Sequence, residues 1–576
     1  MMIIHQATPA RTLDALVARF SDAPTGSRIE AWTFDDRVAR HAAEGALAIR
    51  GVTARFRSAY KPIVTFFLEE VRPGFTAAHI AYPVHQAAVA NRFLLESYPL
   101  AALLAPVMPE FVAGDSDCEY VVTLTYPEGI ETCRVFAPNR LHADLEGGQI
   151  LSPCGWLTYG KDSSAIRTDY ENLFHGALQA IATYEWGQEE PYFEELNLSV
   201  AIPAVDEPLS HDDEVLSLKE AMHEDLYFSL LEYFGHLSAR PAGDRHLQPG
   251  QIVPEIRHGD PEISITLREF EPEDRQGAYQ PLDLATAAPS VAQIRDELAA
   301  IGGTFFTAPT RAGRLTEARH VSGQGAPVMI SAGQHPNETS AVIGALRAAH
   351  QLRQTGAHFT ISPMENPDGY ALQGRLVADN PRHMHHAARY TAFGDDLEYR
   401  QDPDRLYEQG IRRQAETLCR AQIHVNLHGY PAHEWTRPLS GYVPRGFAMW
   451  TLPKGFFLIL RYREGWEVSA RALVDAVTSD LSAIPGLMDM NARQIALYGI
   501  HAGEAGFEIV NGFPCYIAAD SRHRVPLTLI TEYPDETIYG DTFIAAHTAQ
   551  MRTVLAAHAA WQRLAGTGPD QPALMA

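Results

Sequence analysis

A histidine and a glutamate stand three residues apart in the segment 331–340, SAGQHPNETS, of this 576-residue chain. They are His335 and Glu338, and they follow the apolar run 328–330. An imidazole nitrogen and a carboxylate oxygen at this spacing can both bind one Zn2+ ion, which accepts mixed nitrogen and oxygen ligands. The pair alone is weak evidence, because chance pairs of these residue types are common in a long chain. A metal site needs further ligands.

The segments around this pair are predicted to alternate between helix and strand. Ser290 is a plausible N-cap for a helix that begins at residue 291, an apolar strand leads to His335, and an amphipathic helix is expected over 339–354. The next strands are expected at 358–364 and at 421–428, where the second ends at His428. This alternation predicts a mostly parallel sheet whose ligand site lies at the carboxyl ends of its strands.

Residues 1–285 are predicted to form an N-terminal α+β region of unknown role, either one unit or two subdomains. Helices are expected between residues 11 and 72, a β-hairpin over 118–136 and a helix over 217–237. His223 and Glu224 lack the second histidine of an H-E-x-x-H motif, so we interpret them as ordinary helix residues. The linker-like composition of 280–290 places the main boundary there, with a second domain over 286–576.

The composition excludes several classes of function. The 46 basic and 71 acidic residues give a net charge of −25, which argues against nucleic acid or an anionic membrane surface as a partner. Five scattered cysteines without a C-x-x-C motif support neither a disulfide framework nor a thiolate zinc site, and a reducing cytoplasm is the simpler interpretation. No apolar run is long enough to cross a bilayer. The oligomeric state is left open.

Four motifs, taken in order, resemble the zinc carboxypeptidase family, the M14 class of metallopeptidases. They are His335-x-x-Glu338, ENPDGY at 365–370, NLHGY at 426–430 and LTLITEYP at 527–534. The resemblance covers about half of the chain, from residue 290 onward. It implies a carboxypeptidase-like α/β domain over 286–576, in which a mixed, mostly parallel sheet is sandwiched by helices.

The resemblance also implies the parts of a catalytic site. One Zn2+ ion would be bound by His335, Glu338 and His428, with water in the fourth position. Glu532 would take a proton from that water as it attacks an amide carbonyl and would pass it to the leaving amine. The family's oxyanion-stabilising arginine lies between the ENPDGY turn and a downstream motif. Arg382 falls at the expected separation, and Arg375 and Arg389 are the alternatives.

The downstream motif departs from the family's pattern. It reads GDDLEYR over 394–400, so that Glu398 and Tyr399 occupy the positions of an Asn-Arg pair that holds a substrate carboxylate. Arg400 could replace that pair if the backbone is shifted by one residue, but the plainer inference is an altered specificity. The substrate-side tyrosine is Tyr516 or Tyr498. The histidine-rich run 382–386 is expected to be a solvated loop or the rim of a pocket rather than a second metal site.

Three functions follow from these expectations. The first is a cytoplasmic zinc metallopeptidase of carboxypeptidase type, acting on peptides. The second is a zinc amidohydrolase or deacylase acting on N-acyl amino acids or peptidoglycan-type fragments, which the missing Asn-Arg pair favours. The third, disfavoured by the intact ligands and base, is a non-catalytic binding protein built on a decayed peptidase domain.

Overall fold

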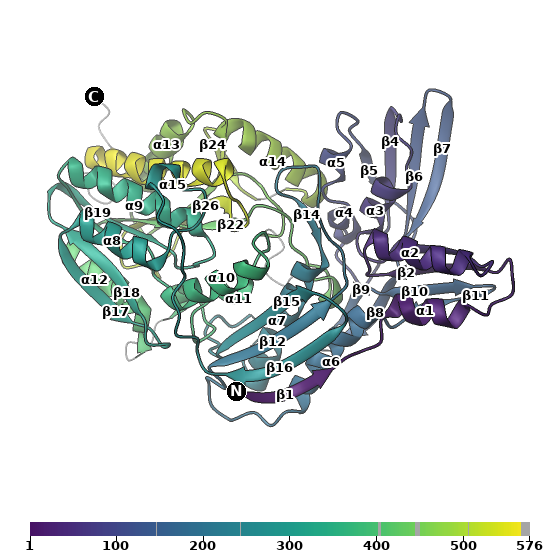
Figure 1. The fold of residues 1–576 in the computed structure, drawn as a ribbon. Helices are drawn as coiled ribbons and strands as arrows, with labels where there is room; N and C mark the ends of the chain where they lie inside the picture. Colours follow the sequence, from purple (N-terminus) through teal and green to yellow (C-terminus); the bar gives the residue numbers. More distant parts are fainter. Residues whose placement is uncertain (146, 242, 401–404, 444–449, 505, 566–576) are drawn as a thin grey trace.

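The computed structural model describes residues 1–145, 147–241, 243–400, 405–443, 450–504 and 506–565 (Figure 1). The protein is a mixed α/β protein with several mixed sheets. In these ranges no helix combines the length and the apolar character that a membrane crossing requires.

The largest sheet has ten strands and lies entirely in the C-terminal half, on the left of Figure 1. Its order is β17-β18-β20-β19-β21-β26-β23-β25-β24, with β22 paired to β26. The strands β20, β19, β21 and β26 at its centre are mutually parallel, whereas most of the flanking pairs are antiparallel. The strand bounds are β17 Thr304–Pro309, β18 Leu315–Val321, β19 Gln324–Ala332, β20 Ala357–Ser362, β21 Ile423–Leu427, β22 Gly429–Pro431, β23 Phe457–Tyr462, β24 Glu508–Val510, β25 Phe513–Ala519 and β26 Leu527–Asp535.

Both faces of the central strand β19 are covered by helices. Val328 and Ile330 belong to the main hydrophobic core together with residues of α9 and α15, whereas Met329 packs with Ile411 of α12. This alternation follows from the two-residue repeat of a strand. It explains why the run VMIS is apolar without interruption up to its last residue. The helix bounds in this half are α8 Val291–Ile301, α9 Thr339–Gln354, α10 Pro367–Asp379, α11 His386–Arg389, α12 Gly410–Cys419, α13 Glu467–Leu481, α14 Leu487–Ala502 and α15 Asp541–Leu564.

The N-terminal half forms smaller sheets, on the right and at the bottom of Figure 1. The predicted hairpin is confirmed as β6 and β7, but the helical prediction for 11–72 is wrong in part. Residues 28–33 and 53–58 form the parallel strands β2 and β3, because their alternating residues pack against α1 and α2. The bounds are β1 Met2–Ala7, α1 Thr12–Phe20, β2 Arg28–Thr33, α2 Arg37–Ala48, β3 Thr53–Ser58, α3 Pro62–Glu69, β4 Ala77–Tyr82, α4 Arg92–Glu96, α5 Leu100–Leu103, β5 Glu110–Ala113, β6 Glu119–Tyr126, β7 Gly129–Phe136, β8 Asn139–Ala143, β9 Gln149–Pro153, β10 Gly155–Tyr159, β11 Asp162–Ile166, α6 Asp169–Thr183, β12 Glu195–Ile202, β13 Asp206–Pro208, β14 Val215–Ser217, α7 Leu218–Leu237, β15 Gln251–His258 and β16 Glu262–Arg268.

The two halves share one hydrophobic core and a set of buried polar contacts. The core that contains α7 also contains Met384, Trp435 and Tyr498 from the C-terminal half. Glu220 of α7 accepts a hydrogen bond from His433 at 2.8 Å, and Glu224 of α7 pairs with a ring nitrogen of His386.

These contacts overturn the expectation that the histidine-rich run is a solvated loop, whereas His383 and His385 do line a small pocket, as the alternative expected. His383, His385 and His386 are all buried, the last of them against the α7 carboxylate of Glu224. Nor do these histidines belong to a second group of metal-ligating side chains in the described part of the chain. The run is a packed part of the boundary between the two halves.

Candidate metal centre

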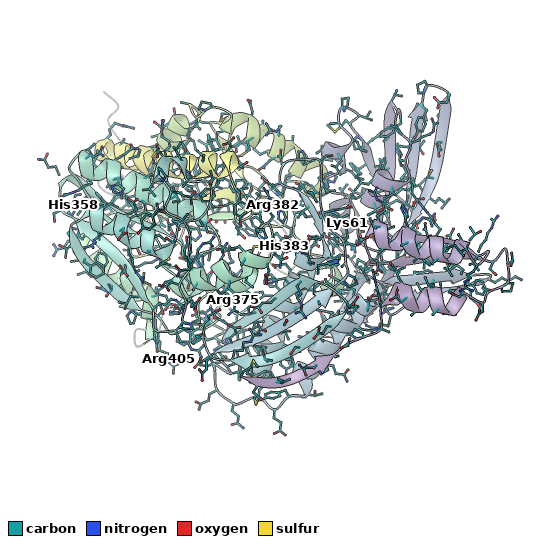
Figure 2. All side chains as sticks on the ribbon, viewed as in Figure 1. Lys61, His358, Arg375, Arg382, His383 and Arg405 are labelled. Atoms are coloured by element: carbon teal, nitrogen blue, oxygen red, sulfur yellow. The ribbon has the colours of Figure 1, made fainter. Side chains whose placement is uncertain are left out.

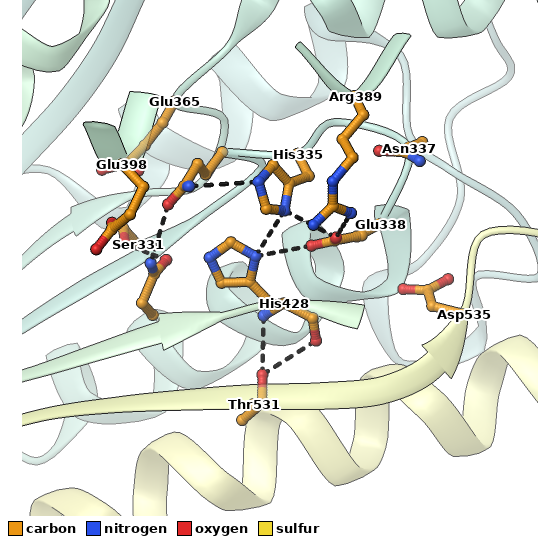
Figure 3. Close-up of polar contacts among 12 residues, drawn as sticks. Ser331, His335, Asn337, Glu338, Glu365, Arg389, Glu398, His428, Thr531 and Asp535 are labelled. Carbon is orange, nitrogen blue, oxygen red and sulfur yellow. Dashed lines mark hydrogen bonds and ion pairs between the residues drawn. The ribbon is translucent and has the colours of Figure 1, made fainter. Parts of the chain in front are cut away.

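Three predicted ligands converge at the carboxyl ends of the central strands (Figure 3). His335 and Glu338 lie in the turn after β19, and His428 follows β21 directly. The Nδ1 atom of His335 is 2.9 Å from Oε1 of Glu338 and 3.0 Å from Nδ1 of His428, which in turn is 3.0 Å from Oε2 of Glu338. All three residues are buried. In the described ranges this is the one group of histidine, cysteine or acidic side chains whose ligand atoms lie close enough to hold a metal ion.

The three ligand atoms fit a small cation with an open coordination position. A tetrahedral zinc site with bonds of about 2.0 Å separates neighbouring ligand atoms by about 3.3 Å. The observed separations of 2.9 to 3.0 Å are slightly shorter than this, so modest side-chain movement admits the ion. Two unprotonated ring nitrogens facing each other at 3.0 Å are also unfavourable without a proton or a cation between them.

The electrostatics of the group favour an ionised carboxylate. Burial opposes ionisation of Glu338, but the imidazoles of His335 and His428 and the guanidinium of Arg389 outweigh it and lower its pKa. Burial lowers the pKa of His428, which favours the neutral imidazole that binds metals.

Neighbouring side chains orient the two histidines. The second ring nitrogen of His335, Nε2, lies 3.5 Å from Oδ2 of Asp396, whose other oxygen accepts a hydrogen bond from Gln334 at 2.9 Å. Carboxylates in this position fix the orientation of metal-binding histidines. The main chain of His428 is held from the other side, because Gln550 of α15 donates to its carbonyl oxygen at 2.8 Å.

The arginine beside the group is Arg389 and not Arg382. Nη1 of Arg389 lies 2.7 Å from Oε1 of Glu338 (Figure 3). The Arg382 side chain is 61% exposed and pairs with Asp213 (Figure 2). The structure therefore does not bring Arg382 to the ligands. Arg375, the other alternative, is directed to three glutamates on and beyond the sheet that contains β12 and β15.

Glu532 lies on β26 near the ligands, and its carboxylate has no hydrogen-bond or ion-pair partner among the described residues. Burial and the nearby charge of Glu338 raise its pKa well above the ordinary value, whereas Arg389 and Lys454 act in the opposite direction. A buried, unpaired carboxyl with a raised pKa is suited to accept and return a proton. Glu536, four residues further along the chain, is another buried carboxyl near the ligands, but it accepts a hydrogen bond from Asn337 at 2.8 Å.

Arg400 is buried in contacts within its own segment. Its guanidinium pairs with Asp395 at 2.5 Å and with Glu408 at 2.7 Å, and it donates to Oγ1 of Thr391 at 2.8 Å. It therefore offers no free donors to a substrate carboxylate, contrary to the possibility that it replaces the Asn-Arg pair.

Glu398 and Tyr399 are also engaged inside the protein. The Glu398 carboxylate pairs with Arg412 at 3.1 Å and with His523 at 3.1 Å, so its charge is compensated. The Tyr399 ring lies beneath the guanidinium of Arg522, 5.1 Å from the ring centroid. Arg412 also contacts Gln334 and in this way connects Glu398 to the residues around His335.

The two tyrosine candidates lie in different places. Tyr516 on β25 is 43% exposed and packs against Arg461, whereas Tyr498 on α14 is buried. Tyr498 lines a cavity of about 990 Å3 between the two halves. Apolar residues of both halves, among them Leu95, Phe174 and Leu439, form its walls.

Lys454 was not among the predicted residues and lies in the same neighbourhood. Its side chain is buried next to Tyr430, which follows His428 by two residues. Trp450 and Phe457 beside Lys454 are close in sequence, but the contacts with Tyr430 and Tyr498 come from distant segments.

Comparison with known proteins gives a partial likeness to solved structures. No model of a protein family and no curated protein matches the chain. A protein from Shewanella denitrificans OS217 with a provisional metallopeptidase name is 15% identical, with a TM-score of 0.29 over 46% of this chain and 88% of its own. A metallo-carboxypeptidase from Burkholderia cenocepacia is 16% identical, with a TM-score of 0.29 over 52% of this chain and 72% of its own. Carboxypeptidase A from Helicoverpa armigera is 12% identical, with a TM-score of 0.28 over 54% of this chain and 90% of its own. At these values the likeness assigns neither a ligand nor an activity, and the site geometry has to carry the functional argument.

Proposed function

We propose that this protein is a zinc-dependent hydrolase of carboxypeptidase type that cleaves an amide bond. The observation that carries this proposal is the meeting of His335, Glu338 and His428 beside the unpaired carboxyl of Glu532. Three metal ligands without a neighbouring base would be as compatible with an ion of purely structural role as with a catalytic ion. A buried base at the same strand ends favours hydrolysis instead.

Each side chain has a distinct role in the proposal. His335, Glu338 and His428 hold the ion, which when bound supplies a Lewis acid and lowers the pKa of water. Glu532 accepts a proton from the attacking water and delivers it to the leaving amine, for which its raised pKa is suited. Arg389 is the cation that contacts the ligand group, and we assign to it the stabilisation of the oxyanion in place of Arg382.

A second candidate function is hydrolysis of small N-acyl amino acids or peptidoglycan-type fragments. Glu398 pairs with Arg412 and Arg400 pairs with Asp395, so neither is free to bind a substrate carboxylate. This favours a departure from ordinary carboxypeptidase specificity. Both candidates use the same ligands and the same base. They differ in the acyl side of the substrate. The five cysteines are all free thiols, in keeping with the proposed cytoplasmic setting.

Metal analysis combined with two variants tests the proposal. The purified protein should bind one zinc ion, and His335→Ala should lose it, whereas His358→Ala, at the start of β20 and away from the carboxyl ends of the strands, should keep it (Figure 2). Glu532→Gln should keep the metal and lose hydrolysis. Screening peptides with free and blocked C-termini beside N-acyl amino acids then separates the two candidate functions. A protein without stoichiometric divalent metal would contradict both of them.

A further inference from the structure

Lys454 is a buried cation without a hydrogen-bond partner. Its side chain is 1% exposed, and its Nζ atom has no hydrogen-bonding partner in the described part of the chain. Four aromatic rings surround the ammonium group, and we call them the aromatic cage. Their centroids lie 4.3 Å (Tyr430), 4.8 Å (Trp450), 5.1 Å (Phe457) and 5.9 Å (Tyr498) from Nζ.

The aromatic cage gives the ammonium group no hydrogen-bond acceptor in the described part of the chain. Four cation–π contacts of about 0.5 to 2 kcal/mol each are comparable to the several kcal/mol that removing an ammonium group from water costs, but they leave its N–H donors without acceptors. Lys61 shows the usual solution in this protein, because its buried ammonium group pairs directly with Glu434. Among the described residues no carboxylate pairs with Lys454 in this way. Its ammonium group can therefore accept an anionic group of a ligand.

The aromatic cage adjoins the candidate metal centre. The Lys454 backbone N–H donates to Oη of Tyr430 at 2.8 Å, and Tyr430 lies on β22, which begins directly after His428. Phe457 pairs in register with Glu532 across β23 and β26. The charges of Lys454 and Glu532 influence each other, yet no ion pair joins them. The base and the ammonium group therefore lie within electrostatic reach of each other without being paired.

Other cations near the ligands are already paired. Arg389 contacts Glu338, Arg412 contacts Glu365 and Glu398, and Arg400 is paired within its own segment. A free carboxylate on a substrate would have to displace a buried ion pair to reach Arg412 or Arg400, and Arg389 is already assigned to the oxyanion. At Lys454 it would meet a cation whose donors are free.

We propose that Lys454 binds the carboxylate of the amide substrate, on the side of the leaving amine, and so replaces the missing Asn-Arg pair. The ligand chemistry is an α-carboxylate, which belongs either to the C-terminus of a peptide or to an N-acyl amino acid. The inference rests on the proposed amide hydrolysis at the same site. It adds that a free carboxylate is required, although Glu398 and Tyr399 stand where the family's carboxylate-binding pair is expected.

Calorimetric titration of the zinc-loaded Glu532→Gln protein at pH 6 tests this proposal. The ligands are matched pairs of acid and carboxamide: N-acetyl-leucine, N-acetyl-phenylalanine and glycyl-phenylalanine, each against its C-terminal amide. We expect the acid of at least one pair to bind tenfold or more tightly than its amide. A preference among the N-acetyl pairs indicates an acylase-type substrate, and a preference in the dipeptide pair indicates a peptidase-type substrate.

The same titration with Lys454→Met added should reduce the acid-to-amide preference to within twofold. Lys219→Met, at a lysine paired with Asp206 on β13, is the matched control and should keep it. If no acid is preferred over its amide, lack of binding included, or if the preference survives in Lys454→Met, the proposal is wrong. These outcomes are separate from those for hydrolysis. If the protein with Lys454 shows no preference while the protein carrying Glu532 turns substrate over, only the role of Lys454 is refuted. A preference without turnover in the protein carrying Glu532 refutes only the enzymatic function.

Discussion

Nη1 of Arg389 lies 2.7 Å from Oε1 of Glu338, the same oxygen that lies 2.9 Å from Nδ1 of His335. A guanidinium group thus contacts a side chain of the candidate metal centre directly. In the proposed hydrolysis, this positive charge would stabilise the carbonyl oxygen as it becomes negative.

Replacing Arg389 with methionine should lower kcat by about 10²- to 10³-fold, the usual effect of removing one oxyanion-stabilising donor. Arg382→Met is the matched control, because that exposed arginine pairs with Asp213 outside the site. It should leave kcat within about twofold. Steady-state kinetics on the two zinc-loaded variants decide between the arginines, and a larger loss in Arg382→Met would reverse the assignment.

Asp396→Asn should weaken zinc binding by about 10- to 100-fold, because the carboxylate next to Nε2 of His335 orients a ligand without touching the ion. Competition with a chelating dye measures the affinity. Asp379→Asn, at the last residue of α10, is a suitable control and should leave the affinity unchanged. An unaltered affinity in Asp396→Asn would show that the ring is oriented by other contacts.

Glu532→Gln should retain zinc and reduce kcat by at least about 10²-fold, since the amide cannot accept the proton of the attacking water. Glu536→Gln tests whether the neighbouring carboxyl acts instead. Because glutamine can still accept the hydrogen bond of Asn337 and Glu536 is not the assigned base, this replacement should leave kcat largely unchanged. Equal losses of kcat in both variants would argue against a single base.

Lys454→Met should increase the free energy of unfolding, with an increment that depends on pH. Burial lowers the pKa of Lys454 to about 7 from 10.5, so the unfolded chain holds more protons than the folded one between these values. The stability of the protein with lysine therefore rises with pH in this window, by up to about 1.4 kcal/mol per pH unit. The advantage of the methionine variant should be largest below pH 7 and should shrink towards pH 10.

Urea unfolding of both proteins from pH 6.5 to 9.5 measures this difference. Lys61→Met provides the contrast, because it removes one partner of a buried ion pair and should cost about 3 to 5 kcal/mol. A Lys454→Met variant that is less stable than the original protein at pH 7 would show that an unidentified group compensates the ammonium charge.

The sequence was sufficient to predict the mixed α/β class and the three residues that meet at the strand ends. His335 and Glu338 are joined by a local spacing, and His428 ends an apolar strand, so a parallel arrangement brings them to one edge of the sheet. The β6–β7 hairpin was predicted for a similar reason, because its two strands are adjacent in sequence. The predicted domain boundary near residue 285 does not separate two independent cores, because the core that contains α7 continues into the C-terminal half.

Only the tertiary structure decided which cations lie near the candidate metal centre. Arg382 and Arg389 lie seven positions apart in a segment with little regular structure, and spacing could not rank them. Contacts across the boundary, such as that of His386 with Glu224, set the course of this segment, and Arg389 is the arginine that contacts Glu338. The role proposed for Lys454 could not be predicted from the sequence for the same reason. A lysine is ordinarily a surface residue, and its burial among four aromatic rings depends on chain segments that come together only when the protein folds.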